Sequence, residues 1–296
     1  MTRTVSLPPE AAGERLDVVL TGVLGISRSQ VQKLLKAGRV QIDGGIVDAK
    51  YTLGGGEEVA IASATVVATP AVPDVPILYE DDDVMVVDKP AGLIVHTSES
   101  GKAEPTVAAF GRAHGVVDED QLRPGIVHRL DKDTSGVMVI AKNLAAKKEL
   151  QRQFRSRSVR KTYTALVRGR LKESEAIVNL PIGRNRKRPV ERAVIAGGRT
   201  AVTHYRVVAT YPGASLLDID LQTGRTHQIR VHFSHIGHPV IGDNLYGSKT
   251  AVPGLARQFL HASKLAFTSP NGTAVEVSSP LPADLQTYLN KLGGGV

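Results

Sequence analysis

The sequence contains no cysteine in its 296 residues. Disulfides, thiolate zinc sites and cysteine nucleophiles are therefore excluded together. It also contains no run of 18 or more apolar residues, so we expect no segment that spans a bilayer. Residues 1–9 lack an apolar stretch long enough for a signal peptide. These absences predict a soluble, cytoplasmic protein with no membrane partner.

Acidic residues are outnumbered, but only in one part of the chain. The formal net charge is +8, yet residues 1–75 carry seven Lys or Arg and eight Asp or Glu, a net of −1. The rest of the chain therefore carries +9. A positive field of this kind favours a polyanionic partner, and RNA or DNA is the expected polyanion.

Residues 13–62 have the pattern of a small α+β domain. Apolar residues recur at helical spacing from Leu16 to Leu20, and Ser27 is a suitable N-cap for a second helix over residues 28–37. Three short strands are expected after this helix, at residues 40–42, 46–47 and 58–61.

The second helix of this domain and its end are basic. Between Arg28 and Arg39 there are four basic residues and no acidic one, within a segment that is otherwise acid-rich. The asymmetry favours a phosphate-binding face over the alternative of a merely solvated helix face. It predicts RNA contacts by Arg28, Lys33, Lys36 and Arg39.

Residues 63–76 contain three prolines and little periodicity, which is typical of a linker. The second predicted domain, residues 77–296, has many short strand patterns and few long helices. We therefore expect a mixed, mostly antiparallel α+β domain. Within it, Asn143 should cap a helix over residues 144–156, and residues 259–267 should form a buried edge strand.

The densest group of polar side chains precedes an apolar strand pattern at residues 137–141. Asp131 lies there among the cations His128, Arg129 and Lys132. Polar groups packed against a buried strand are costly unless they are paired or used. Neighbouring cations favour an ionised carboxylate, which suits a nucleophile or a base and argues against a general acid.

Two basic runs follow this motif. Residues 142–161 hold eight basic residues and one acidic residue, Glu149, and a second basic loop covers residues 183–188. Runs of this kind are often solvated surface, but their place after the candidate site favours contact with an RNA backbone. The predicted contacts are Arg155, Arg157, Arg160, Lys161, Arg186 and Lys187.

Three motifs in this order resemble the RluA/RluD family of pseudouridine synthases over residues 77–296. They are His-Arg-Leu-Asp-Lys-Asp-Thr-Ser-Gly at residues 128–136, Lys-x-Tyr-x-Ala at 161–165, and Thr-Gly-Arg-Thr-His-Gln-Ile-Arg at 223–230. The N-terminal pattern, with its Arg-Leu-Asp opening and Ser-Arg-Ser, resembles the RNA-binding module first named from the S-four ribosomal protein.

The resemblance implies a pseudouridine synthase fold that isomerises uridine within RNA, with no metal and no organic cofactor. The sequence agrees with this, because it has no Walker loop and no Gly-x-Gly-x-x-Gly after a strand.

By the same resemblance, Asp131 is the catalytic carboxylate, and it either adds to C1′ of the ribose or removes the C2′ proton. Tyr163 stacks on the target base and assists removal of the C5 proton, and Arg230 pairs with Asp131. Ile229 and Arg225 line the substrate pocket, and Arg129 fills the gap that the everted nucleotide leaves. The histidines His128, His227 and His232 are expected to be structural hydrogen-bonding groups.

The resemblance favours large-subunit ribosomal RNA as the substrate, within its helix 69 stem-loop. We also expect a monomer, because an asymmetric substrate needs no symmetric partner. Two alternatives remain at this point. One is the same chemistry on transfer RNA or on other ribosomal sites. The other is a non-catalytic RNA-binding protein that assists ribosome assembly.

Overall fold

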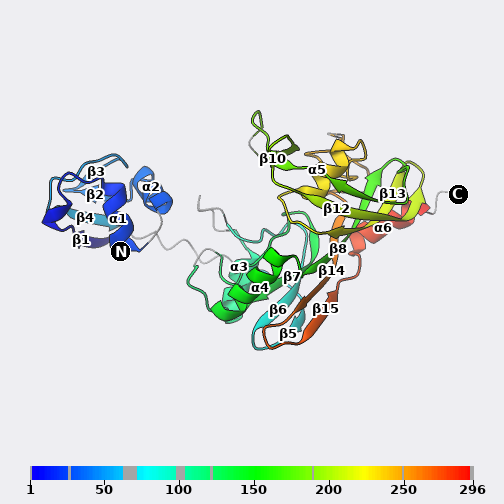
Figure 1. The fold of residues 1–296 in the computed structure, drawn as a ribbon, viewed down its shortest axis with the longest axis horizontal. Coiled ribbons are helices and arrows are strands. Elements are labelled where there is room, and N and C mark those ends of the chain that lie inside the picture. Colours follow the sequence, from blue (N-terminus) through cyan, green and yellow to red (C-terminus); the bar gives the residue numbers. More distant parts are fainter. Residues whose placement is uncertain are drawn as a thin grey trace. The chain divides into compact units, whose positions relative to one another are not determined.

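The structure is a computed structural model that describes residues 2–25, 28–62, 72–97, 104–120, 123–188, 190–248 and 250–293. The chain forms two compact units, Met1–Thr69 and Pro70–Val296, each with its own hydrophobic core. The elements of both units are labelled in Figure 1. Within the described ranges, none of the helices is long and apolar enough to cross a membrane.

The N-terminal unit is an antiparallel sheet covered by two helices. The strand order is β1-β4-β2-β3. Its elements are β1 (Thr2–Ser6), the 3₁₀ helix η1 (Pro9–Ala11), α1 (Leu16–Leu24), α2 (Arg28–Lys36), β2 (Val40–Ile42), β3 (Gly45–Ile46) and β4 (Glu58–Ala62). Leu16 and Leu20 of α1 pack with Val31 and Leu35 of α2 in its core, as the helical spacing predicts.

The start of this unit differs from the sequence-based expectation. Strand β1 lies ahead of residue 13, and it pairs with β4 along its whole length, from Thr2 opposite Ala62 to Ser6 opposite Glu58. A short strand at a chain terminus carries too little pattern to be recognised without its partner. The predicted N-cap Ser27 and residues 63–71 of the predicted linker lie outside the described residues, so the predicted linker stays a prediction.

The C-terminal unit is built on a nine-stranded mixed sheet, in the order β5-β6-β7-β14-β8-β13-β12-β9 with β15 paired to β14. The strands are β5 (Ile77–Glu80), β6 (Val84–Lys89), β7 (Ser135–Ala141), β8 (Arg160–Arg168), β9 (Glu175–Asn179), β12 (Val202–Tyr211), β13 (Ala214–Leu221), β14 (Leu260–Thr268) and β15 (Ala274–Ser278). A separate hairpin joins β10 (Ile182–Arg184) to β11 (Arg192–Val194).

Four helices complete this unit: α3 (Val107–Ala113), α4 (Leu144–Ser156), α5 (Gln228–His235) and α6 (Ala283–Gly293). The Asn143 side chain accepts a hydrogen bond from the Ala146 amide at 2.9 Å, so it caps α4 as predicted. Strand β7 is buried on both faces, because Val137 and Val139 pack with residues of α4 while Met138 and Ile140 pack with residues of α3. The predicted α+β class, with a mostly antiparallel sheet, is confirmed.

Strand β14 is central, and the expectation of an edge strand at this position was wrong. It pairs in parallel with β7 and antiparallel with β8, so it joins the two halves of the sheet. The approach to β7 is close: a Cβ on Gly136, whose φ is +116°, would lie 2.2 Å from the Ala262 carbonyl oxygen. A buried apolar strand looks the same in sequence whether it is central or at an edge, because only pairing distinguishes the two.

His128 should make the stability of this unit sensitive to acid. Its Nε2 accepts the Val139 amide at 3.1 Å and its ring stacks on Phe154, with centroids 4.7 Å apart. Burial, assisted by the charge of Lys161, lowers the pKa of His128 to about 3. The unfolded chain binds a proton here below pH ~6.5, so this stability is present above that pH and is lost as the pH falls.

We therefore expect the unfolding free energy of the wild type to fall between pH 7 and pH 5 by about 1 kcal/mol more than that of His128→Gln. Glutamine keeps an acceptor but does not titrate. Urea unfolding at the two pH values measures both differences. Equal losses in the two proteins would show that His128 is not the acid-sensitive group.

Candidate active site

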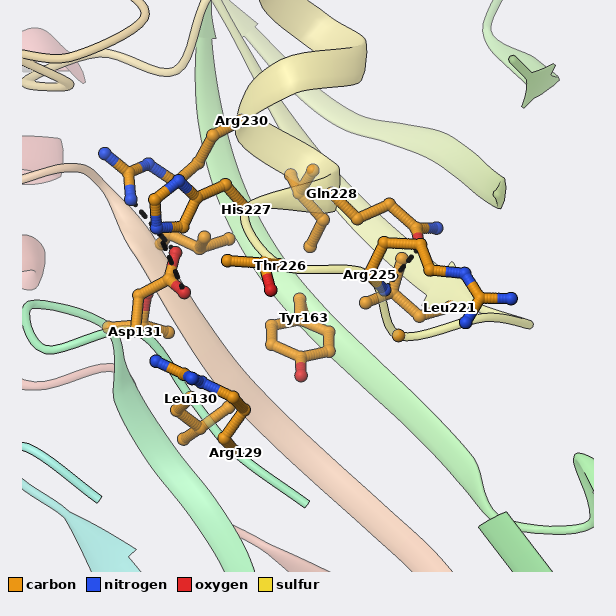
Figure 2. Close-up of a pocket in the computed structure, with 14 residues that line it drawn as sticks. Arg129, Leu130, Asp131, Tyr163, Leu221, Arg225, Thr226, His227, Gln228 and Arg230 are labelled. Carbon is orange, nitrogen blue, oxygen red and sulfur yellow. Dashed lines mark hydrogen bonds and ion pairs between the residues drawn. The ribbon is translucent and has the colours of Figure 1, made fainter. Parts of the chain in front are cut away.

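A pocket lies where three distant segments of the C-terminal unit meet. The loop before β7 brings Asp131, strand β8 brings Tyr163, and the first turn of α5 with the loop before it brings residues 224–230. In Figure 2, Asp131 and Arg230 point toward one another, and the Tyr163 ring lies to the right of Asp131 in this view. The predicted substrate-binding residues Arg129, Arg225 and Ile229 line the same pocket.

Arg230 is fixed between two carboxylates. Its Nη1 donates to Asp131 Oδ2 at 3.0 Å, while Nε and Nη2 donate to Asp243 Oδ2 and Oδ1 at 2.7 and 3.0 Å. The guanidinium also lies 5.1 Å from the centroid of the Tyr246 ring. Although burial opposes its charge, the hydrogen bond and charge of Asp243, with those of Asp131, raise the pKa of Arg230 above its ordinary value. The guanidinium is therefore both permanently charged and held in one orientation.

Asp243 is the anchor of this arrangement, and the sequence analysis did not identify it. It is 1% exposed and also accepts the amide hydrogens of Leu245 and Tyr246. Burial opposes its ionisation, but the hydrogen bonds and charge of Arg230 lower the pKa of Asp243 below the ordinary range. It lies in a Gly-Asp-Asn turn whose pattern predicts a turn and nothing more, since no spacing rule links residue 243 to residue 230.

Tyr163 lies on β8 with 8% of its surface exposed. Burial, with the negative charge of Asp131 adding to it, raises the pKa of Tyr163 above its ordinary value. The phenol therefore stays protonated at neutral pH. Its ring offers an apolar face beside the Asp131 carboxylate, and its hydroxyl is not a ready proton acceptor.

His227 also belongs to the pocket, although the sequence analysis kept it outside the catalytic set. It is the N-cap of α5 with φ +58°, a left-handed conformation that is uncommon for a residue other than glycine. Its Nε2 lies 3.8 Å from Asp131 Oδ1. Burial lowers the pKa of His227 against the opposing effect of Asp131, so the ring is neutral at pH 7.

The tautomer of His227 follows from its second contact. Its Nδ1 lies 2.8 Å from the Tyr246 hydroxyl, and that hydroxyl accepts the Arg192 amide at 2.7 Å. The tyrosine hydroxyl can in addition donate its own proton to Nδ1. We therefore predict that the His227 proton resides on Nε2, the ring nitrogen that lies 3.8 Å from Asp131 Oδ1.

The predicted RNA contacts fall into different surroundings. Arg155, Arg157 and Lys161 line a second cavity with Arg129 and Arg225, next to the pocket. Arg160 lies instead on the other face of β8, with its Nη2 3.6 Å from Glu276 Oε2. The remaining candidates of this unit, Arg186 and Lys187, are exposed between β10 and β11.

In the N-terminal unit, Arg28 is already engaged. Its Nε and Nη2 donate to Asp17 at 3.1 and 3.2 Å, and Arg15 and Gln32 donate to the same buried carboxylate. Half of the Arg28 side chain, 51%, remains exposed. Of the other candidates, Lys36 is exposed, Arg39 is half-buried, and the side chain of Lys33 lies outside the described part of the chain. Their RNA contacts stay predictions.

Both units of the chain resemble known proteins. The family model described as RNA pseudouridylate synthase matches residues 83–235, and the model of the S4 domain matches residues 14–59. A protein of Mycobacterium bovis named as an uncharacterized RNA pseudouridine synthase is 41% identical over 304 residues, covering 99% of this chain and 98% of the relative. Ribosomal large subunit pseudouridine synthase D of Xanthomonas campestris is 39% identical over 317 residues, covering 98% and 92%.

A solved structure also resembles the chain. Human RNA Pseudouridylate Synthase Domain Containing 1 superposes with a TM-score of 0.58 at 28% sequence identity, covering 74% of this chain and 95% of the human chain. The likeness at this identity extends beyond local motifs to the arrangement of the sheet and its helices.

The state of His227 can be tested by NMR. Spectra that correlate the ring nitrogens with the ring protons should show a neutral imidazole at pH 7 with its proton on Nε2, and His227→Gln identifies the signal. In Tyr246→Phe the donor to Nδ1 is lost, so the other tautomer should become populated. A proton on Nδ1 in the wild type, or a titration at the ordinary pKa of histidine, would contradict the assignment.

Proposed function

Because the chain belongs to the RNA pseudouridine synthases, we propose that Asp131 is the carboxylate with which it isomerises uridine in RNA. In this reaction the bond from N1 of uracil to C1′ breaks, the base turns over, and C5 bonds to C1′ while the C5 proton leaves. The observation that carries the proposal is the 3.0 Å contact between Arg230 Nη1 and Asp131 Oδ2 in a pocket shared with Tyr163.

An ionised carboxylate suits either of the two routes open to this reaction. It can add to C1′ as the glycosidic bond breaks, or it can accept the C2′ proton so that a glycal forms. Arg230 orients Asp131 in both. When RNA covers the pocket and excludes water, this ion pair strengthens because the effective dielectric constant falls.

Tyr163 and Arg129 are proposed to hold the everted nucleotide. The buried Tyr163 ring offers its face to the uracil, which must stay close to C1′ while it turns over. Its protonated hydroxyl makes the tyrosine a stacking group in this proposal, with no role as the base that takes the C5 proton. Arg129 is exposed at the rim of the pocket, where its side chain can fill the gap in the RNA stack.

We propose large-subunit ribosomal RNA as the substrate, at the helix 69 stem-loop. The support is the similarity to proteins named ribosomal large subunit pseudouridine synthase D, together with the S4 domain ahead of the catalytic unit. The same proposal makes the enzyme cytoplasmic and monomeric, since an asymmetric RNA substrate requires no symmetric partner. A pure assembly factor is disfavoured, because binding alone has no use for a carboxylate placed among cations.

Replacing Asp131 with Asn should lower the rate of tritium release from C5-labelled uridine RNA by at least about 10²–10⁴-fold. RNA affinity should change little, because one carboxylate is altered among many basic contacts. Asp133→Asn is the matched control, since Asp133 lies two residues away and does not line the pocket; it should keep most of the activity. Full activity of Asp131→Asn would remove Asp131 from the mechanism.

The substrate is tested by mapping pseudouridine in RNA from cells that lack the gene. The modifications of helix 69 should disappear from large-subunit ribosomal RNA and return when the wild-type gene, but not the Asp131→Asn gene, is supplied. Loss of pseudouridine confined to transfer RNA or to another ribosomal site would support the proposed reaction but contradict the proposed substrate.

A further inference from the structure

A second cavity adjoins the pocket and has one sign of charge. Its lining includes five basic residues, Arg129, Arg155, Arg157, Lys161 and Arg225, and no Asp or Glu. These five residues are called the basic groove here. The groove shares Arg129, Arg225 and Tyr163 with the pocket that holds Asp131, so the two cavities adjoin one another.

Three residues of the basic groove, Arg155, Arg157 and Lys161, do not line the pocket. Of these three, Lys161 is the least exposed to water. It lies two residues before Tyr163 on β8, so both side chains project from the same face of the strand. Its Nζ lies 5.9 Å from the centroid of the Phe154 ring. Among the described residues, no carboxylate lies within ion-pair distance of Lys161. A half-buried ammonium group without an anion is costly, and the cost is offset when an anion binds.

Arg157, the C-cap of α4, adds a second cation to the groove beside Lys161. It ends that helix with φ +63°, a left-handed position where glycine is the usual residue. An arginine at this position places a guanidinium in the groove at the expense of backbone strain, which is a pattern of binding sites. Arg155, in the last turn of the same helix, adds a further cation.

We propose that the basic groove binds a phosphodiester next to the everted uridine, with Lys161 as its central cation. The inference rests on the proposed function, because it places the base on Tyr163. Since Lys161 is only two residues from Tyr163, the phosphate that reaches it belongs to the target nucleotide or to its immediate neighbour. The groove thereby fixes the position of the sugar relative to Asp131.

The charge of Lys161 makes this contact sensitive to pH. Burial, with the charge of Arg157 adding to it, lowers the pKa of Lys161 to about 8. A bound phosphate favours the ammonium form, so the pKa is higher in the complex than in the free protein. The affinity is therefore highest well below pH 8 and declines as the pH rises through this value.

Four of the other side chains that line the groove, Arg129, Arg155, Arg157 and Arg225, are arginines. Burial keeps the pKa of Tyr163 above its ordinary value and lowers that of His128 to about 3, so the phenol is protonated and the imidazole is neutral. Among the described residues that line the groove, the pH dependence is thus specific to Lys161.

The test measures binding, without turnover, in the full-length Asp131→Asn protein. Its affinity for a stem-loop RNA, followed by fluorescence anisotropy, should weaken roughly five-fold between pH 7 and pH 8.8. Adding Lys161→Arg should keep the affinity at pH 7 and remove most of this decline. Lys148→Gln, which neutralises an exposed lysine of α4 outside the groove, is the matched control and should decline like its parent.

A second variant, Lys161→Met in the same background, should bind more weakly at pH 7 and lower the slope of log affinity against log salt by about 0.7–0.9, the value for one phosphate contact. An unchanged decline with pH in Lys161→Arg, or an unchanged affinity and salt slope in Lys161→Met, would overturn the inference. These outcomes are independent of whether Asp131 is catalytic, which the tritium-release assay decides separately.

Discussion

The site depends on one guanidinium shared by two carboxylates. Asp243 is buried and holds two nitrogens of Arg230, which leaves the third nitrogen to contact Asp131 at 3.0 Å. Removing one partner of such a buried ion pair leaves an uncompensated charge in a poorly solvated place, at a cost of about 3–5 kcal/mol. The arrangement therefore persists as a unit, and it presents Asp131 in a single orientation.

The sheet brings the residues of this site together. Strand β14 lies between β7 and β8, and the absence of a side chain at Gly136 permits its close parallel contact with β7. The loop that carries Asp131 is thereby placed beside Tyr163 on β8. Helix α5 then contributes Arg230 from its first turn, and His227 is the N-cap of the same helix. Chemistry that requires sub-ångström placement is thus supported by regular elements of the fold.

The pocket and the basic groove beside it differ in their charged side chains. The pocket holds the carboxylate that we propose acts on the sugar, and the proposed phosphate position lies in a groove of cations beside it. An anionic catalytic group repels a polyanion, so the neighbouring cations must provide the attraction that brings RNA into place. In the N-terminal unit, Asp17 likewise organises Arg15 and Arg28 around one buried carboxylate. Both units present basic side chains from rigid positions.

The sequence alone determined the local structure and the chemical identity of the main groups. Helical spacing located α1, α2 and α4 with the Asn143 cap. Motif order predicted Asp131, Tyr163 and Arg230 as the catalytic set, and these three residues line one pocket. Only the tertiary structure decided that β14 is central, that Asp243 anchors Arg230, and that His227 faces Asp131. The physical reason is that periodicity and capping act over a few neighbouring residues, whereas strand pairing and buried ion pairs join residues far apart in the chain, and one sequence does not record such contacts.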